Sequence, residues 1–132
     1  MKKLILIFII AVSLVACKKT KFAPEGPTDV RVENLSDQTW IQVIVNTSGG
    51  IDTLGNIASH AKSAYFRFEK AFNVAEISAT IGGEKYSTGV PNYTYLAYIG
   101  QAKITYQVWI SDPTHKVLEI SHCSLDAPLD SI

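Results

Sequence analysis

The stretch VAEISATIGGEKYST, residues 74–88, alternates apolar and polar side chains with a period of two. Its alternating apolar positions are Ala75, Ile77, Ala79 and Ile81. Such alternation is typical of a β-strand that buries one face. Gly82 and Gly83 follow directly, and both central residues of a type I′ turn need a positive φ. The stretch therefore predicts a β-hairpin whose second strand covers residues 84–88.

The same alternation predicts strands on both sides of this hairpin. It is clearest at residues 103–111, where Ile104, Tyr106, Val108 and Ile110 share one face. Shorter runs predict further strands at residues 29–33, 40–47, 63–69 and 116–123. A short helix near residues 70–75 is an alternative for that segment. Six to eight short strands separated by turns predict an all-β fold, an antiparallel β-sandwich of immunoglobulin-like type.

Residues 40–47 differ from the other runs because apolar side chains occupy both predicted faces. Ile41, Val43 and Val45 share one face, and Trp40 and Ile44 share the other. Successive side chains of a strand point to opposite faces. We therefore expect this strand to be central, or to be covered on both sides.

The N-terminus has the pattern of an export signal. Lys2 and Lys3 precede an apolar run at residues 4–15, which is too short to span a bilayer because spanning takes about 20 apolar residues. The sequence Leu14-Val15-Ala16-Cys17 resembles the bacterial lipobox. The resemblance implies that residues 1–16 are removed and that Cys17 is acylated at the new N-terminus. Cleavage after Ser13 is the alternative.

This processing would leave a lipidated tether at residues 17–27 and a β-sandwich domain at residues 28–132. Two or more acyl chains give stable anchoring, so we expect Cys17 to hold the protein on a membrane. Lys18, rather than an aspartate, follows the cysteine, which favours the outer membrane of the cell envelope. Whether the domain faces the periplasm or the cell surface is left open.

The charge balance argues against a nucleic-acid partner. The chain carries 12 basic and 12 acidic side chains, and removal of residues 1–16 deletes the two basic side chains Lys2 and Lys3. Affinity for nucleic acid depends on clustered Lys and Arg. After Cys17 the only arginines are Arg31 and Arg67.

Several segments together resemble a family of small Bacteroidota lipoproteins of uncharacterised function. Besides the lipobox, they are Val30-Arg31-Val32-Glu33-Asn34, Gly55-Asn56-Ile57 before Ser63-Ala64-Tyr65, Ile77-Ser78-Ala79-Thr80-Ile81-Gly82-Gly83, and Thr105-Tyr106-Gln107-Val108. The resemblance implies a β-sandwich and offers no activity or cofactor. This chain departs from the family at Ser59-His60-Ala61-Lys62, where many members have a glycine-containing turn.

Two tripeptides resemble the O-glycosylation signal of Bacteroidota, which is an aspartate, then serine or threonine, then an aliphatic residue. They are Asp52-Thr53-Leu54 and Asp130-Ser131-Ile132. The resemblance implies a glycan on Thr53. An aspartate at a turn is the alternative explanation for the first tripeptide.

No combination of residues predicts catalysis or metal binding. His122 and Cys123 are adjacent, but neighbours in a strand point to opposite faces and cannot share a proton along it. If Cys17 is acylated, Cys123 has no partner for an intramolecular disulfide. His115, His122 and Asp126 have no spacing typical of zinc ligands. We therefore expect no cofactor and no enzymatic activity.

Residues 89–100, here called the tyrosine segment, are the most unusual part of the chain. Tyr93, Tyr95 and Tyr98 crowd an uncharged stretch between Pro91 and Gly100. Tyrosines on loops are common binding residues because each offers a large amphipathic face at low entropic cost. The alternatives are that the rings cover the end of the sandwich, or that the segment forms another strand.

The sequence thus favours a non-enzymatic, membrane-anchored binding module whose partner is an envelope protein or glycan. A structural accessory subunit of an outer-membrane complex is the second hypothesis. A hydrolase is the third, and it would require a cleft that holds His122 or two close carboxylates.

Overall fold

Eight β-strands and no helix make up the part of the chain that the computed structural model describes, residues 24–129. The strands are β1 (Thr28–Asn34), β2 (Trp40–Asn46), β3 (Ile51–Ile57), β4 (Phe66–Phe68), β5 (Glu76–Ile81), β6 (Glu84–Ser87), β7 (Ala102–Asp112) and β8 (Val117–Pro128). The predicted all-β fold is confirmed. The predicted signal peptide, the acylation site Cys17 and most of the tether lie outside the described residues.

All eight strands belong to one mixed sheet with the order β3-β2-β5-β6-β8-β7-β1-β4. Two pairs are parallel: β1 runs beside β7 from Thr28↔Ala102 to Asn34↔Val108, and β6 meets β8 at Ser87↔Val117. The other pairs are antiparallel. The sheet curls round its core, and a bridge between Gly49 and Lys70 brings its two ends together. The mixed sheet was not predicted, and the immunoglobulin-like sandwich stays a prediction.

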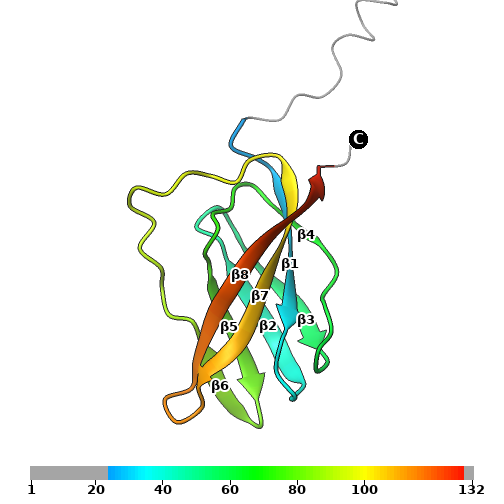
Figure 1. Ribbon diagram of the computed structural model, residues 1–132, viewed down its shortest axis with the longest axis vertical. Coiled ribbons are helices and arrows are strands. Elements are labelled where there is room, and N and C mark those ends of the chain that lie inside the picture. Colours follow the sequence, from blue (N-terminus) through cyan, green and yellow to red (C-terminus); the bar gives the residue numbers. More distant parts are fainter. Residues whose placement is uncertain (1–23, 130–132) are drawn as a thin grey trace, which may run out of the picture.

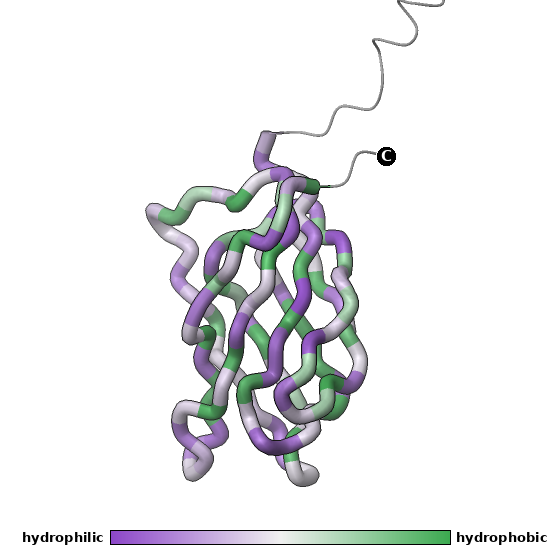
Figure 2. Tube along the Cα trace, turned by 45° about the vertical axis from the view of Figure 1, so that its right-hand side comes forward, coloured by the Kyte–Doolittle hydropathy of each residue, from purple (hydrophilic) through white to green (hydrophobic). Residues whose placement is uncertain are grey.

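The core follows the predicted alternation. Side chains of β1, β5 and β7 that face inward are almost completely buried, among them Val30, Val32, Ile77, Ile104 and Tyr106. Figure 2 shows the corresponding change between hydrophilic and hydrophobic residues along the strands. Gly82 and Gly83 have φ values of 59° and 81°, so the predicted turn between β5 and β6 is confirmed.

The predicted faces of residues 40–47 are confirmed for Val43, Ile44 and Val45 but are wrong for Trp40 and Ile41. Trp40 is completely buried, whereas Ile41 is 42% exposed. A bulge causes the difference: Gln42 has a φ of 50°, and the pairing register of β2 shifts between Trp40 and Val43. One extra residue in a bulge turns the following side chains to the other face. Trp40, Val43 and Val45 therefore all enter the core.

Three further segments differ from their predictions. Residues 51–57 form β3, which was not predicted as a strand. The strand predicted at residues 63–69 is reduced to the three residues of β4, and Ala64 lies outside it and is exposed. Residues 70–75 are not helical.

One end of the domain gathers the first described residues, the return of the tyrosine segment into β7, and the end of β8 (Figure 1). Thr28 Oγ1 donates a hydrogen bond to the carbonyl oxygen of Gly100 across 2.6 Å. The β5–β6 and β7–β8 turns lie at the opposite end (Figure 1).

Candidate binding surface

The tyrosine segment lies in the connection between β6 and β7, and it forms no strand. In Figure 1 it is the yellow-green chain that stands away from the sheet on the left. Its backbone is held at few points. Leu96 N–H donates to the Tyr93 carbonyl across 3.1 Å, and Ile99 N–H donates to the Ala71 carbonyl across 2.8 Å. The strand alternative for this segment is therefore wrong.

Phe72 is the base on which the segment rests. This ring is 6% exposed, and it contacts two of the three tyrosines. The Tyr93 ring centroid lies 4.8 Å from that of Phe72 in a tilted arrangement, and Tyr98 is stacked at 4.6 Å. Lys70 Nζ lies 5.1 Å from the Tyr98 ring centroid, within cation–π range. Tyr93 and Tyr98 thus have a packing role as well as any role in binding.

Burial also affects the hydroxyl of Tyr93. Desolvation is the main reason why the pKa of this hydroxyl is raised, and a hydrogen bond with the backbone of Glu76 opposes the shift. The Tyr93 hydroxyl lies 3.4 Å from the carbonyl oxygen of Asn46, to which it donates. Tyr93 therefore contacts Phe72 through its ring and Asn46 through its hydroxyl, and these contacts hold the middle of the segment against the sheet.

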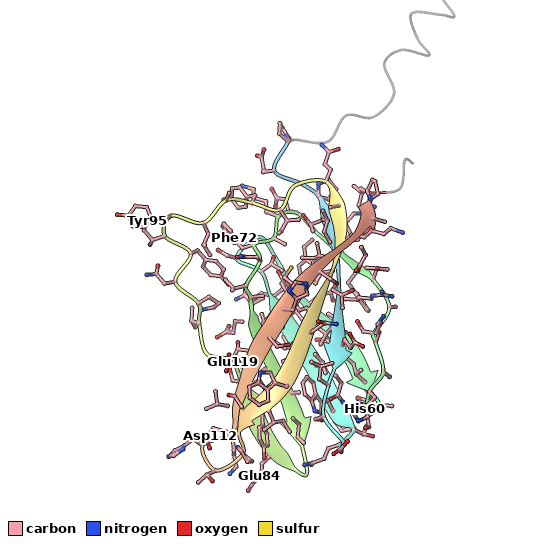
Figure 3. The ribbon with its side chains drawn as sticks, viewed as in Figure 1. His60, Phe72, Glu84, Tyr95, Asp112 and Glu119 are labelled. Carbon is pink, nitrogen blue, oxygen red and sulfur yellow. The ribbon has the colours of Figure 1, made fainter. Side chains whose placement is uncertain are left out.

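Tyr95 has a different environment from its two neighbours. It is fully exposed, and its φ of 70° is unusual for a residue other than glycine. Figure 3 shows Tyr95 pointing away from the domain, while Phe72 lies between the segment and the sheet. Three further apolar residues on or beside the segment are exposed: Val90 by 78%, Leu96 by 37% and Tyr98 by 45%. We call Val90, Tyr95, Leu96 and Tyr98 the crest.

A polar network covers the outer face of β1, β7 and β8, and it centres on Asp126. Its carboxylate accepts hydrogen bonds from Tyr65 at 2.7 Å, from Ser124 at 2.8 Å, and from Thr105. Arg31 Nε lies 3.8 Å from the same carboxylate. Burial opposes ionisation of Asp126, but these hydrogen bonds outweigh it and lower its pKa.

One candidate metal ligand, Asp126, belongs to this network. Its carboxylate already accepts hydrogen bonds from protein side chains. His115 Nδ1 lies 2.7 Å from the Asp112 carboxylate in the β7–β8 turn, and His122 is exposed on β8. Within residues 24–129 no three His, Cys, Asp or Glu side chains gather as a metal site would require. The structure therefore does not bring His115, His122 and Asp126 together.

Cys123 is half-buried and packs against the core. Burial, followed by the charge of Asp126, raises the pKa of its thiol to about 11. A nucleophilic cysteine needs the opposite shift, because the thiolate is the reactive form. His122 and Cys123 thus form no nucleophile–base pair.

Thr53 is exposed on β3, at one end of the sheet. Its N–H donates to the Asp52 carboxylate across 2.9 Å. Because β3 includes Asp52, this residue lies in a strand. The interpretation of Asp52 as a turn residue is therefore wrong. The hydroxyl of Thr53 lies on an exposed residue, as modification would require, and glycosylation itself stays a prediction.

Trp40 and Trp109 are placed differently. Trp40 is completely buried and donates from Nε1 to Ser36 Oγ across 2.8 Å. Trp109 is 42% exposed, beside a pocket of about 340 Å³ that Leu35, Gln38 and Pro113 also line. Of the two tryptophans, only Trp40 therefore belongs to the hydrophobic core.

Comparison with known proteins adds support for the fold. No family model matches the chain, and no curated protein matches it. Among solved structures, the chain is similar to the NMR structure of a protein from Eubacterium rectale, with a TM-score of 0.51 and 14% identity. The alignment covers 81% of this chain and 100% of that one. At this identity the likeness concerns the fold alone. Within the described residues there is no helix with the length and hydropathy to cross a membrane.

Proposed function

We propose that the protein is a membrane-anchored, non-enzymatic binding module of the cell envelope that contacts an envelope protein or glycan through the crest. One observation carries this proposal: four exposed apolar residues lie within residues 90–98 of one segment, and Tyr93 and Tyr98 pack that segment on Phe72. Exposed apolar residues that are concentrated in one region are typical of interaction sites. Because Phe72 holds Tyr93 and Tyr98 in place, the segment loses less conformational entropy when a partner binds.

The anchor in this proposal is Cys17. The lipobox supports it, and the eleven-residue tether at residues 17–27 would place the domain close to the membrane surface. Replacing Cys17 with alanine should abolish palmitate labelling and release the chain from the membrane fraction. Labelling that persists in Cys17→Ala would contradict the anchor without bearing on the crest.

The crest is tested by the double variant Tyr95→Asn and Leu96→Ala, made in the full chain. Asparagine suits position 95 because it tolerates a positive φ, so the ring is lost while the backbone is kept. Crosslinking in native membranes and binding to a glycan array are the two measurements. We expect the partner signal to fall about tenfold or more, because exposed aromatic residues often carry most of an interface's affinity.

The matched control is Ile41→Ala. Ile41 is also an exposed apolar residue, at 42%, and it lies on β2 opposite Thr80, beside the β5–β6 turn and away from the tyrosine segment. The control should keep the full signal. Equal signals from the crest variant and the control would contradict the crest as the contact surface. Retention of crosslinks to an outer-membrane complex in both would instead favour a structural accessory subunit.

A further inference from the structure

Strand β8 has one edge that the rest of the sheet does not cover. Along its other edge β8 pairs with β7 from Asp112↔Val117 to Ala102↔Pro128. Towards β6 it has a single bridge, Ser87↔Val117. In the described part of the chain, no strand therefore pairs with this edge from Leu118 onwards.

The edge is open because the chain leaves the sheet after β6. Thr88 N–H still donates to the Ile77 carbonyl, so this residue stays beside β5 instead of following β8. Gly89 then has a φ of 76° and begins the tyrosine segment. No backbone hydrogen bond joins that segment to β8 among residues 24–129. Figure 1 shows the segment standing clear of β8 before it returns into β7.

A pocket of about 220 Å³ lies beside the start of this edge. Its apolar lining comes from Val74, Ala75, Pro91, Leu118 and Ile120, and the exposed Glu119 also lines it. Figure 3 shows Glu119 on β8 near the start of the tyrosine segment. Within the described residues Glu119 has no ion pair. The pocket is large enough for an aliphatic side chain, and a negative charge lies next to it.

The edge lacks most of the features that usually protect such strands. Natural sheets block exposed edges with lysine, proline, bulges or a very short strand, and of these β8 has the bulges, where its register with β7 shifts between Ile120 and His122 and between Leu125 and Ala127. From Leu118 to Asp126, β8 contains no Lys, Arg or Pro, and it is the longest strand of the sheet within the described residues. Another extended polypeptide can form hydrogen bonds with a row of unpaired backbone N–H and C=O groups. A glycan has no donors and acceptors at the same regular spacing.

We propose that the open edge of β8 accepts an extended segment of a partner protein as an additional strand. This inference rests on the proposed function and specifies its partner as a polypeptide. An aliphatic side chain of the partner enters the pocket beside Leu118 and Ile120. The adjacent residue of the partner points to the opposite face and carries a basic side chain that pairs with Glu119. The crest flanks the added strand.

The test uses the full chain in detergent micelles and the peptide acetyl-Lys-Val-Lys-Val-Lys-Val-Lys-amide at millimolar concentration. Amide hydrogen exchange is followed by mass spectrometry. We expect exchange at residues 118–124 to slow about tenfold, because strand pairing protects amides from solvent. A twin peptide with alternate backbone nitrogens methylated has the same charge and side chains. It should give no protection, because it cannot form the ladder.

A charge swap tests the role of Glu119. The variant Glu119→Lys should lose the response to the Lys-Val peptide and gain it with the corresponding Glu-Val peptide. Equal protection by the methylated twin would overturn strand addition. So would a chain that is already dimeric through β8, because its edge would then be occupied by a second copy.

The two proposals fail separately. Protection of residues 118–124 that persists in the Tyr95→Asn, Leu96→Ala variant supports strand addition even if the crest is not a contact surface. No protection of β8, in a chain whose partner signal still depends on the crest, overturns strand addition and leaves the proposed function standing.

Discussion

The ring of Tyr98 lies stacked on Phe72, with the two centroids 4.6 Å apart and the planes inclined by 29°. Phe72 is the residue that both Tyr93 and Tyr98 contact, and its own backbone carbonyl accepts a hydrogen bond from the buried hydroxyl of Tyr106. The tyrosine segment is thereby connected to β7 in the core. Its conformation therefore depends on a residue outside the segment.

Replacing Phe72 with alanine should destabilise the domain and loosen the tyrosine segment. Truncation of a buried phenylalanine costs about 3 kcal/mol in the free energy of unfolding. The matched control is Tyr95→Ala, which removes a fully exposed ring and should change stability by less than about 0.5 kcal/mol. Urea denaturation of both variants measures the difference. Similar stabilities would contradict the role given to Phe72.

Replacing Gly49 with alanine should also destabilise the domain, for a steric reason. A Cβ atom at Gly49 would lie 2.7 Å from the Lys70 backbone oxygen and 2.8 Å from its backbone nitrogen. Relieving such overlap costs about 1–3 kcal/mol, and it would move Lys70 relative to Tyr98. Gly55→Asn should cost less, because nothing lies within 4 Å of a Cβ there and Asn tolerates a positive φ. The reverse order of melting temperatures would disprove this argument.

Asp126 should make the domain sensitive to acid. Its pKa is lower in the folded chain than the ordinary value of 3.8, so its contribution to stability is complete above that ordinary value. The contribution is lost as the pH falls through the folded pKa. Melting curves between pH 7 and pH 2.5 should show a smaller acid-induced loss for Asp126→Asn than for the unaltered chain. Parallel curves would show that the network does not stabilise the carboxylate.

The thiol of Cys123 should react slowly with thiol reagents in the folded domain. A pKa of about 11 instead of 9.0 reduces the thiolate fraction at pH 8 about a hundredfold. Reaction with Ellman's reagent at this pH should therefore be slower by roughly that factor than in the urea-unfolded chain, and Cys123→Ser provides the blank. Because the folded pKa is the higher one, stability should fall as the pH rises from about 9 to about 11. Equal reaction rates would contradict the assigned burial.

Thr53 should carry the added mass if the tripeptide Asp52-Thr53-Leu54 is a modification signal. Intact-mass measurement of the mature chain from its native cell tests this. Both Asp52→Ala and Thr53→Ala should remove the same mass. A mature chain whose mass is accounted for by the polypeptide and acyl groups alone would exclude a glycan at this position.

Alternation with a period of two predicted the strands whose one face is buried along their whole length, such as β1, β5 and β7. It failed where the backbone itself changes the period. The bulge at Gln42 moves Trp40 into the core. In β3 the buried residues Leu54 and Ile57 are three positions apart, and Gly55 between them has a φ of 83°. Local patterns do not encode such shifts unless a glycine or asparagine marks them.

For the candidate site, the sequence predicted which segment is unusual but not how its side chains are arranged. The crowding of Tyr93, Tyr95 and Tyr98 identified the segment, but no local signal distinguishes Tyr95, which does not contact Phe72, from the two rings that pack on it. Phe72, which makes that distinction, lies some twenty residues earlier in the chain. The open edge of β8 was not predictable either, because it depends on strand order, and strand order depends on contacts between distant segments.

The parallel pairing of β1 with β7 has a consequence for the order in which the protein can be made. Thr28 lies beside Ala102, so most of the chain separates the first strand from its long neighbour. Until β7 has been synthesised, β1 can pair only with the three-residue β4 and through the bridge between Glu33 and Lys62, and Val30 and Val32 lack most of their cover. Such non-local pairing slows folding and exposes apolar surface in the meantime. Nascent chains that end before Ala102 should therefore be the form most dependent on chaperones.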